Sequence, residues 1–273
     1  ITYSRAEVRF LVEYAARLSI RVVPELDMPA HTASWIFGEP SVVANCTQVL
    51  PESEEDRKNP FKVRDKLALD VTAPETDALV KDVLTEMAEL FPDPFLHLGG
   101  DEVDFRCWSS VPKIASRLRE KKLELKGALQ KFFDRVFKVV ERLGRRAMLW
   151  QDALDQGLEV PEGTVIQPWK CWVGGGENFG LPKLTQRGLL WGHLAAAHVV
   201  ETDLHTISST CWYLDWELQW KDVYRRGADE GLVGEGGEAS PLLLGGEAAV
   251  WTERIDLTNL DCRVWPRAAA GRS

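Results

Sequence analysis

The sequence predicts an α/β fold built on a parallel β-sheet, and among such folds it favours a (β/α)8 TIM barrel. Short apolar segments alternate with longer segments of helical periodicity, which is typical of a parallel sheet with helices on both faces. The 273 residues are an ordinary length for one barrel domain. Polar and aromatic residues follow the apolar segments repeatedly, as expected where active-site loops leave the C-terminal ends of barrel strands. The alternative, a doubly wound sheet, would concentrate such residues at one crevice.

Helical periodicity predicts three helices, over residues 4–19, 72–91 and about 112–143. The first begins with Ser4 and Glu7, which have the spacing of a capping box. The second has Thr72 and Glu75 at the same spacing, so we expect a capping box there as well.

Six short apolar segments predict the strands, and we expect them to belong to one domain that spans residues 1–273. They are IRVVPEL (20–26), FLHL (95–98), RAMLW (146–150), TVIQPW (164–169), TISST (206–210) and LLLGGEAAVW (242–251). A closed barrel needs eight strands, so two are missing from this count. Residues 171–205 have the least regular pattern, although LTQRGLLWGHLAAAHVV within them is compatible with a helix.

The composition excludes several classes of function. The net charge of −9, from 33 basic and 42 acidic residues, disfavours partners such as nucleic acid or an anionic membrane surface. No apolar run approaches the roughly 18 residues of a membrane-spanning helix. The five cysteines have no C-x-x-C spacing, which disfavours a zinc site. We expect neither a metal nor a cofactor.

The segment HLGGDEVDFRCW (97–108) carries the clearest chemical signal. Asp101 and Glu102 are adjacent carboxylates after a predicted strand, and the two preceding glycines allow close approach by another group. The chain also contains eleven tryptophans, whose commonest functional use is stacking on sugars. Two carboxylates in an aromatic-rich cleft suit glycoside hydrolysis. Because neighbouring residues cannot flank one sugar on opposite faces, this pair points to a substrate that supplies its own nucleophile.

The segment HLGGDEVDFRCW resembles the signature of the family 20 glycoside hydrolases, the β-N-acetylhexosaminidases, in particular the eukaryotic lysosomal type. Further blocks of similarity follow in the family's order. They are RVVPELDMPAHTASW (21–35), MLWQD (148–152), VIQPWK (165–170), CWYLDW (211–216), WKDVY (220–224), LGGEAAVWTE (244–253) and VWPRAAA (264–270). The resemblance therefore covers nearly the whole chain.

The resemblance implies a retaining, substrate-assisted hydrolysis of terminal non-reducing β-linked N-acetylglucosamine or N-acetylgalactosamine. In that mechanism the 2-acetamido oxygen attacks the anomeric carbon. Glu102 is then the general acid and base, and Asp101 orients the acetamide and stabilises its developing positive charge. The remaining matches are Trp150, Trp169 and Trp251 as the walls of the sugar pocket, Tyr213 as the hydroxyl that binds the acetamide oxygen, Asp215 and Glu253 as acceptors for sugar hydroxyls, and His31 and Asp27 as residues that hold the acid through hydrogen bonds.

Two departures from the family pattern concern the ends of the chain. Family members have two strands before residues 20–26, and these carry an arginine and an aspartate that grip the sugar. This chain begins after them, with a polar segment that lacks methionine, and it ends before the family's last helix is complete. By the resemblance it is a catalytic domain truncated at the N-terminus, a fragment or a processed chain, whose barrel is incomplete.

The loops after the first two visible strands contain Cys46 and Cys107. Neighbouring barrel strands bring such loops together at one face, so we expect a Cys46–Cys107 disulfide. Asn45 lies in the triplet N-C-T and is a formal glycosylation acceptor. Both features imply an oxidising setting in the secretory pathway, either lysosomal or extracellular. A homodimer is a candidate assembly.

Other interpretations stay open at this point. The letters GGDE also occur in diguanylate cyclases, but there they lie on a hairpin turn, and the tryptophans would have no role. An inactive carbohydrate-binding relative, or a non-functional fragment of such an enzyme, would keep the tryptophan pocket without turnover. In the WYLDW block no Arg or Lys adjoins Asp215, so we expect neutral sugars to be preferred over 6-sulfated ones.

Overall fold

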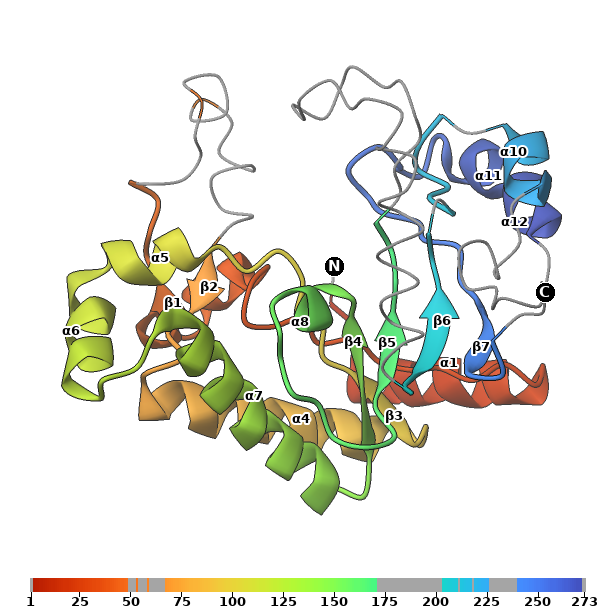
Figure 1. Cartoon of the computed structure of the whole chain (residues 1–273). Coiled ribbons are helices and arrows are strands. Elements are labelled where there is room, and N and C mark those ends of the chain that lie inside the picture. The colour runs from red at the N-terminus through yellow and green to blue at the C-terminus, as the bar shows by residue number, and fades with distance from the viewer. Residues whose placement is uncertain are drawn as a thin grey trace. The chain divides into compact units, whose positions relative to one another are not determined.

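A computed structural model of the chain describes residues 2–48, 53, 58, 67–170, 203–210, 212–217, 219–225 and 240–271 (Figure 1). The chain forms two compact units, Ile1–Pro161 and Glu162–Ser273. The helix considered within residues 171–205 lies outside the described residues, apart from the last three positions of that range.

The first unit combines a parallel pair of strands with helices and a small antiparallel ladder (Figure 1). Its helices are α1 (Arg5–Arg17), α4 (Pro74–Leu90), α5 (Phe105–Ser110), α6 (Pro112–Glu120), α7 (Leu125–Arg142), α8 (Asp152–Asp155) and the 3₁₀ helices η1 (Ala33–Phe37) and η2 (Pro40–Val42). Its strands are β1 (Val43–Ala44), β2 (Ala68–Leu69), β3 (Phe95–His97) and β4 (Arg146–Trp150). β1 and β2 pair antiparallel, whereas β3 and β4 pair in parallel.

The predicted strand at residues 20–26 is reduced to one bridge beside β3. Glu25 and His97 form an isolated parallel bridge, and the N–H of Leu26 donates to the carbonyl of His97 at 2.9 Å. Pro24 has no N–H to donate to a ladder, although its carbonyl accepts from His97 at 3.0 Å. The segment therefore follows the edge of β3 without becoming a regular strand.

Of the two capping boxes predicted from the sequence, the one at the start of α1 is present and the one near the start of α4 is not. Ser4 and Glu7 form the predicted capping box of α1, with each side chain accepting from the other's backbone N–H. The box expected at Thr72 is wrong, because α4 begins at Pro74 and its N-cap, Ala73, has no side-chain bond. The hydroxyl of Thr72 instead donates to Asp70.

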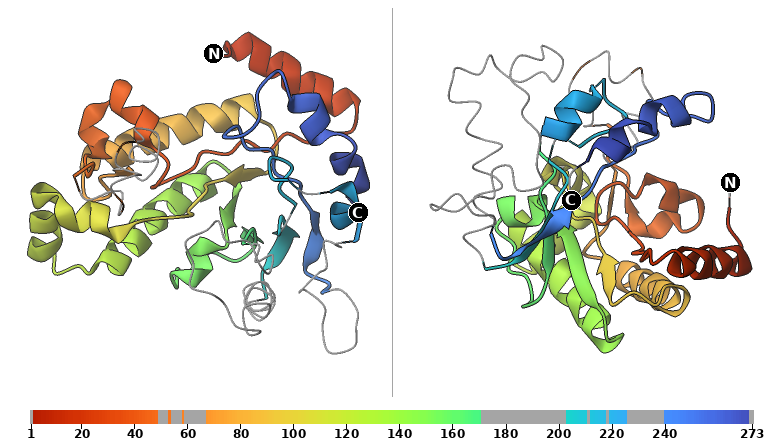
Figure 2. Two further views of the ribbon diagram at one scale, coloured as in Figure 1. Left: turned by 90° about the horizontal axis from the view of Figure 1, so that it is seen from above. Right: turned by 90° about the vertical axis from the view of Figure 1, so that its right-hand side faces the viewer.

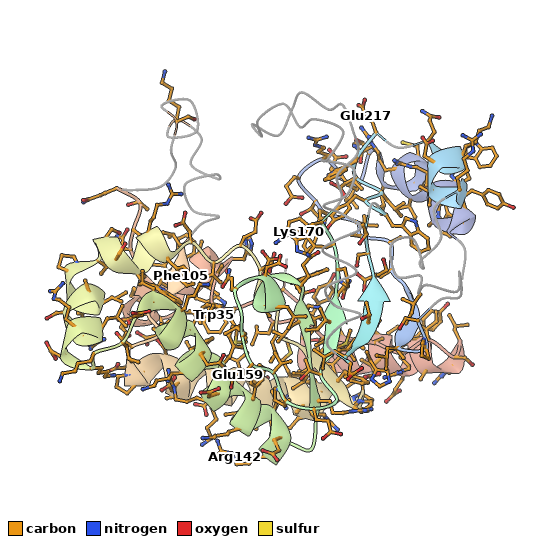
Figure 3. All side chains as sticks on the ribbon, in the orientation of Figure 1. Trp35, Phe105, Arg142, Glu159, Lys170 and Glu217 are labelled. Atoms are coloured by element: carbon orange, nitrogen blue, oxygen red, sulfur yellow. A yellow bond between two sulfur atoms is a disulfide. The ribbon has the colours of Figure 1, made fainter. Side chains whose placement is uncertain are left out.

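The third predicted helix is two helices, α6 and α7, separated by a turn in which Lys122 has a φ of 51°. α7 packs against α4 and β4 (Figure 1, Figure 2). Its buried side chains recur at helical spacing, and Arg142 at its end projects outward (Figure 3). The buried set is Ala128, Leu129, Phe132, Phe133, Val136, Phe137 and Val140. This apolar face forms much of the core of the first unit.

The predicted disulfide is present and joins the segment after β1 to α5. Cys46 and Cys107 are bonded, with Cα atoms 5.0 Å apart. The neighbouring Trp108 is fully buried, and its indole N–H donates to the carbonyl of Leu69 at 2.9 Å. α5 is thus fixed to the β1–β2 ladder by a covalent bond and a hydrogen bond.

The described residues of the second unit form three parallel strands and three short helices. They are β5 (Val165–Gln167), β6 (His205–Ser208), β7 (Leu243–Gly246), α10 (Trp220–Arg225), α11 (Leu260–Val264) and α12 (Arg267–Ala270). β6 pairs with both β5 and β7, and α12 packs against α10 and α11 (Figure 2). The buried guanidinium of Arg267 donates to the carbonyl of Trp216 at 2.7 Å.

The predicted α/β architecture with parallel strands is therefore confirmed. The part of the chain that is described contains five parallel strands, β3 to β7, rather than the eight of a closed barrel. Within that same part, no helix combines the length and apolar composition needed to cross a lipid bilayer.

Replacing both Cys46 and Cys107 by Ala is expected to lower the free energy of unfolding by about 4 kcal/mol. The bond closes a loop over a sequence separation of 61 residues. Closing such a loop lowers the entropy of the unfolded chain, and this loss accounts for the expected free energy. Urea unfolding measures the difference. Cys262, which is free and exposed, offers the control variant Cys262→Ala, which should unfold like the unmodified chain. Identical curves for the double variant and the control would contradict the prediction.

Candidate active site

The loop after β3 adopts left-handed backbone conformations that two glycines make accessible. Gly99 and Gly100 have φ values of 67° and 94°, and Glu102 follows with a φ of 50°. A Cβ atom at Gly99 would lie 1.7 Å from Oδ1 of Asp27. The N–H of Gly100 donates to that same oxygen at 3.2 Å. The glycines therefore let the loop lie directly against the Asp27 side chain.

Four of the predicted residues of the first unit come together at this loop. Nε2 of His31 lies 3.5 Å from Oδ2 of Asp101 and 3.7 Å from Oε2 of Glu102. Asp27 is hydrogen-bonded to Asp101. The other oxygen of Asp101, Oδ1, is buried and has no hydrogen-bond partner. His31 thus faces both catalytic candidates, and Asp27 contacts Asp101.

Burial and charge push the two aspartates in opposite directions. Burial, together with the negative charge of Asp101, raises the pKa of Asp27 to about 9. Burial also opposes the charge of Asp101, but the hydrogen bond and charge of His31, together with the hydrogen bond to Asp27 and one to the backbone, outweigh it, so the pKa of Asp101 falls below its ordinary value. Near neutral pH Asp27 is therefore neutral and Asp101 is ionised.

The side chains of Asp27, His31 and Asp101 are also close enough together to be considered as ligands of a metal ion. Ligand atoms of Asp27, His31 and Asp101 all lie within 4.8 Å of one another. A cation would need ionised carboxylates, whereas the hydrogen bond between the two aspartates already requires a proton. The arrangement fits a hydrogen-bonded chain better than a metal centre.

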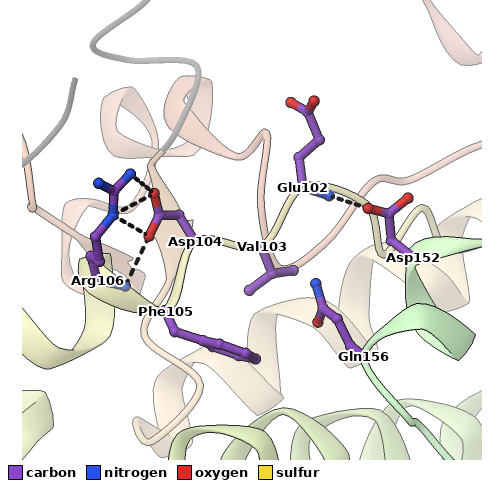
Figure 4. A pocket seen from close by; sticks show the side chains of 7 residues that line it. All are labelled: Glu102, Val103, Asp104, Phe105, Arg106, Asp152 and Gln156. Carbon is purple, nitrogen blue, oxygen red and sulfur yellow. Dashed lines mark hydrogen bonds and ion pairs between the residues drawn. The ribbon is translucent and has the colours of Figure 1, made fainter. Parts of the chain in front are cut away.

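A cavity of about 520 Å³ opens beside Glu102 (Figure 4). It is lined by Glu102, Val103, Asp104, Phe105, Arg106, Asp152 and Gln156. The backbone N–H of Glu102 donates to Oδ1 of Asp152 at 3.4 Å, while its carboxylate points away from that residue (Figure 4). Asp104 pairs with Arg106, and Oε1 of Gln156 is buried without a partner. The cavity therefore has a carboxylate at its edge and an amide oxygen in its lining.

Trp150 lies at the end of β4 and is 3% exposed. Its indole N–H donates to Oε1 of Glu25 at 2.9 Å, and its ring contacts that of His97 with centroids 4.9 Å apart. Burial raises the pKa of the Glu25 carboxyl. Glu25 and Asp152 are not among the residues predicted for the site, although both lie inside matched blocks.

In the second unit two of the predicted aromatic residues, Trp169 and Tyr213, form a group with Trp216, which was not predicted. The rings of Tyr213 and Trp216 are stacked with centroids 4.7 Å apart, and Trp169 meets Tyr213 edge-on at 6.4 Å. Trp251 is 40% exposed, which leaves part of its ring accessible to a ligand. The sequence did not indicate the buried hydrogen bonds of Gln167, whose side-chain amide donates to Ser209 and to Glu247.

Asp215 is almost fully buried, and its Oδ1 has no hydrogen-bond partner. Burial raises its pKa, and the exposed Glu253 adds to that rise. Arg254, however, has a charge close enough to lower the pKa of Asp215. Arg254 has the smallest of these effects, and the pKa of Asp215 remains raised overall. The expected preference for neutral over 6-sulfated sugars stays a prediction.

The chain is similar to subunits of β-hexosaminidase over most of its length. It is 32% identical over 274 residues to "Beta-hexosaminidase subunit beta" of Mus musculus, covering 98% of this chain and 45% of that protein. It is also 32% identical over 275 residues to "Beta-hexosaminidase subunit alpha" of Bos taurus, covering 98% and 46%. The chain thus spans about half the length of the curated relatives that it matches.

Solved structures agree with this similarity. The β-N-acetylhexosaminidase of Bacteroides fragilis superimposes with a TM-score of 0.71 and 27% identity, over 98% of this chain and 50% of that one. The chitobiase of Flavobacterium johnsoniae superimposes with a TM-score of 0.74 and 23% identity, over 98% and 37%, and shows a shared fold. The profile described as "Glycosyl hydrolase family 20, catalytic domain" matches residues 1–272. With the paired carboxylates at its strand end, the chain belongs to glycosyl hydrolase family 20.

Proposed function

We propose that the chain hydrolyses terminal non-reducing β-linked N-acetylhexosamine residues by a retaining, substrate-assisted mechanism. The observation that carries the proposal is that two adjacent carboxyl groups have different surroundings. Asp101 has a buried oxygen with no partner, whereas Glu102 lies at the edge of a 520 Å³ cavity. The names of the similar β-hexosaminidase subunits support this substrate class.

Asp101 would accept a hydrogen bond from the N–H of the 2-acetamido group. That contact turns the acetamide oxygen toward the anomeric carbon, and the ionised carboxylate offsets the positive charge of the resulting oxazolinium. Burial of Asp101 strengthens the effect, because water screens the interaction less. The unpartnered Oδ1 is the atom available for this contact.

Glu102 would donate its proton to the glycosidic oxygen as the bond to the leaving group breaks. The same carboxylate then removes a proton from the water that opens the oxazolinium ring, which restores the acetamide and gives a product of retained configuration. The left-handed backbone at Glu102 supports these separate roles, since its carboxylate points away from Asp152 and past the lining of the cavity (Figure 4).

We further propose that the parallel strands belong to a (β/α)8 barrel and that the second unit contributes the sugar-binding surface. Trp169, Tyr213 and Trp251 would face the sugar ring, while Asp215 and Glu253 would accept hydrogen bonds from its hydroxyls. The unpartnered oxygen of Asp215 supports an acceptor role. These features would also serve a protein that binds the sugar without turnover, which is the alternative function.

Glu102→Gln is expected to reduce kcat on a disaccharide of N-acetylglucosamine by about 10²–10⁴-fold, since proton donation is lost. The reduction should be smaller on a 4-nitrophenyl glycoside, whose leaving group needs less help from an acid. Asp101→Asn should reduce kcat by about 10²–10³-fold on both substrates. Steady-state kinetics measure each value.

The control for these variants is Glu141→Gln, which changes an exposed residue on α7 and should leave kcat unchanged. An Asp101→Asn variant with the kcat of the unmodified chain would contradict the substrate-assisted mechanism. A chain that binds N-acetylglucosamine in calorimetry but hydrolyses neither substrate would support the alternative function.

We also propose that the protein passes through the secretory pathway, to a lysosomal or extracellular destination, and carries a glycan on Asn45. Asn45 is exposed, and the hydroxyl of Thr47 donates to its side-chain oxygen at 3.1 Å. Expression through the secretory pathway of a eukaryotic cell should add a glycan whose mass is removed by an endoglycosidase. Asn45→Gln should abolish that mass, whereas Asn259→Gln, outside any acceptor triplet, should retain it. A digestion-insensitive mass would contradict the assignment.

A further inference from the structure

Asp27 is a buried acidic residue for which the reaction proposed above has no direct use. It is not among the residues that line the cavity beside Glu102. Its side chain instead meets Asp101 and the backbone of Gly99 and Gly100.

The groups around Asp27 favour one negative charge, rather than two, on the pair Asp27 and Asp101. Asp101 faces it from the loop after β3, and Glu25 and His31 act on it from its own segment. The only imidazole among these groups, that of His31, lies 3.5 Å from Oδ2 of Asp101. His31 is thus placed to offset the charge of Asp101, whereas its attraction for a charge on Asp27 is outweighed by burial and by the charge of Asp101.

We propose that Asp27 is a positioning residue that carries the proton shared by the two aspartates and donates it in a hydrogen bond to Asp101. The consequence of this arrangement is that Asp101 stays ionised and oriented toward the acetamide, and only this consequence rests on the proposed function. The carbonyl oxygen of the neutral Asp27 carboxyl accepts from the N–H of Gly100. A neutral carboxyl has one donor and one acceptor site here, and both are used.

The isosteric variant Asp27→Asn separates this role from a structural one. An Asn amide also has one oxygen that accepts from Gly100 and an NH₂ group that donates to Asp101. Asp27→Asn should therefore retain kcat to within about tenfold. Asp27→Ala keeps neither bond, so its kcat should fall by at least about 10²-fold, with a smaller change in KM.

The pH profile of kcat gives a second readout. Activity falls as pH decreases through the pKa of Asp101, because this residue must be ionised. Asp27→Ala removes a hydrogen bond to the charged form, which should raise that pKa and move the acid limb by about one unit upward. The acid limb of Asp27→Asn should stay in place. A low kcat for both variants would overturn the proposal.

Stability against pH tests the proton without any turnover. The pKa of Asp27 is raised to about 9 in the folded chain, against about 4 for an ordinary Asp. Between these values the folded chain binds one more proton than the unfolded chain, so the unmodified protein loses stability as pH rises. Asp27→Asn has no such proton. The ratio of the two unfolding constants should therefore change about tenfold per pH unit between pH 5 and pH 8, in favour of the Asn variant.

Urea unfolding of both proteins across this range measures the ratio. A ratio that is constant with pH would show that Asp27 is ionised in the folded chain and would overturn the proposal. If the unmodified chain does not hydrolyse the sugar, the proposed function fails, but this measurement still decides where the proton lies.

A backbone variant tests the close approach itself. Gly99→Ala places a Cβ 1.7 Å from Oδ1 of Asp27, whereas Gly144 has the same φ of 67° with no atom within 4 Å of its Cβ position. Gly144→Ala therefore introduces the same backbone strain alone. We expect Gly99→Ala to lower kcat by at least about 10²-fold and Gly144→Ala to leave it unchanged, with folding of both checked by circular dichroism. Equal kcat values for the two variants would overturn the role assigned to the Asp27 contact.

Discussion

The carboxyl cluster of the first unit depends on one close approach, between the side chain of Asp27 and the backbone of Gly99 and Gly100. Two ionised carboxylates about 4 Å apart oppose each other by about 4 kcal/mol at an effective dielectric constant near 20. That repulsion is avoided here because Asp27 is neutral and His31 faces Asp101. The contact between the Asp27 segment and the loop after β3 therefore depends on two conditions together. The glycine backbone allows the close approach, and the neutral form of Asp27 avoids the repulsion.

The other side of the loop rests on the apolar core. A Cβ at Gly100 would meet Leu149 of β4 at 3.2 Å and Phe133 of α7 at 3.4 Å. Both of these side chains are buried, so the loop is confined between the core on one side and Asp27 on the other. The disulfide at Cys107 fixes the start of α5 just beyond Glu102. The loop thus has little freedom to move the two carboxylates, and such preorganisation is what electrostatic catalysis requires.

Local interactions account for the parts of the fold that the sequence could predict. The capping box at Ser4 involves residues three positions apart, and the apolar strands depend on their own composition. The prediction at Thr72 was wrong because Pro74 determines where α4 begins. Predictions also missed contacts between distant residues. Glu25 and Trp150 are 125 positions apart, and Glu102 and Asp152 are 50 apart. Arg254 lies 39 positions after Asp215, and no local pattern indicates that their charges interact.

Buried polar atoms without a hydrogen bond occur in both units. A buried acceptor without a hydrogen bond costs about 1–3 kcal/mol, so native structures contain few of them unless a ligand supplies the partner. The described residues contain five such atoms, on Asp101, Arg145, Gln156, Trp212 and Asp215. Two of these are aspartate oxygens at positions matched to sugar contacts, and a third, on Gln156, lines the cavity beside Glu102. A core optimised for stability alone would have paired these three oxygens. Each of these oxygens can accept a hydrogen bond that no described residue donates to it.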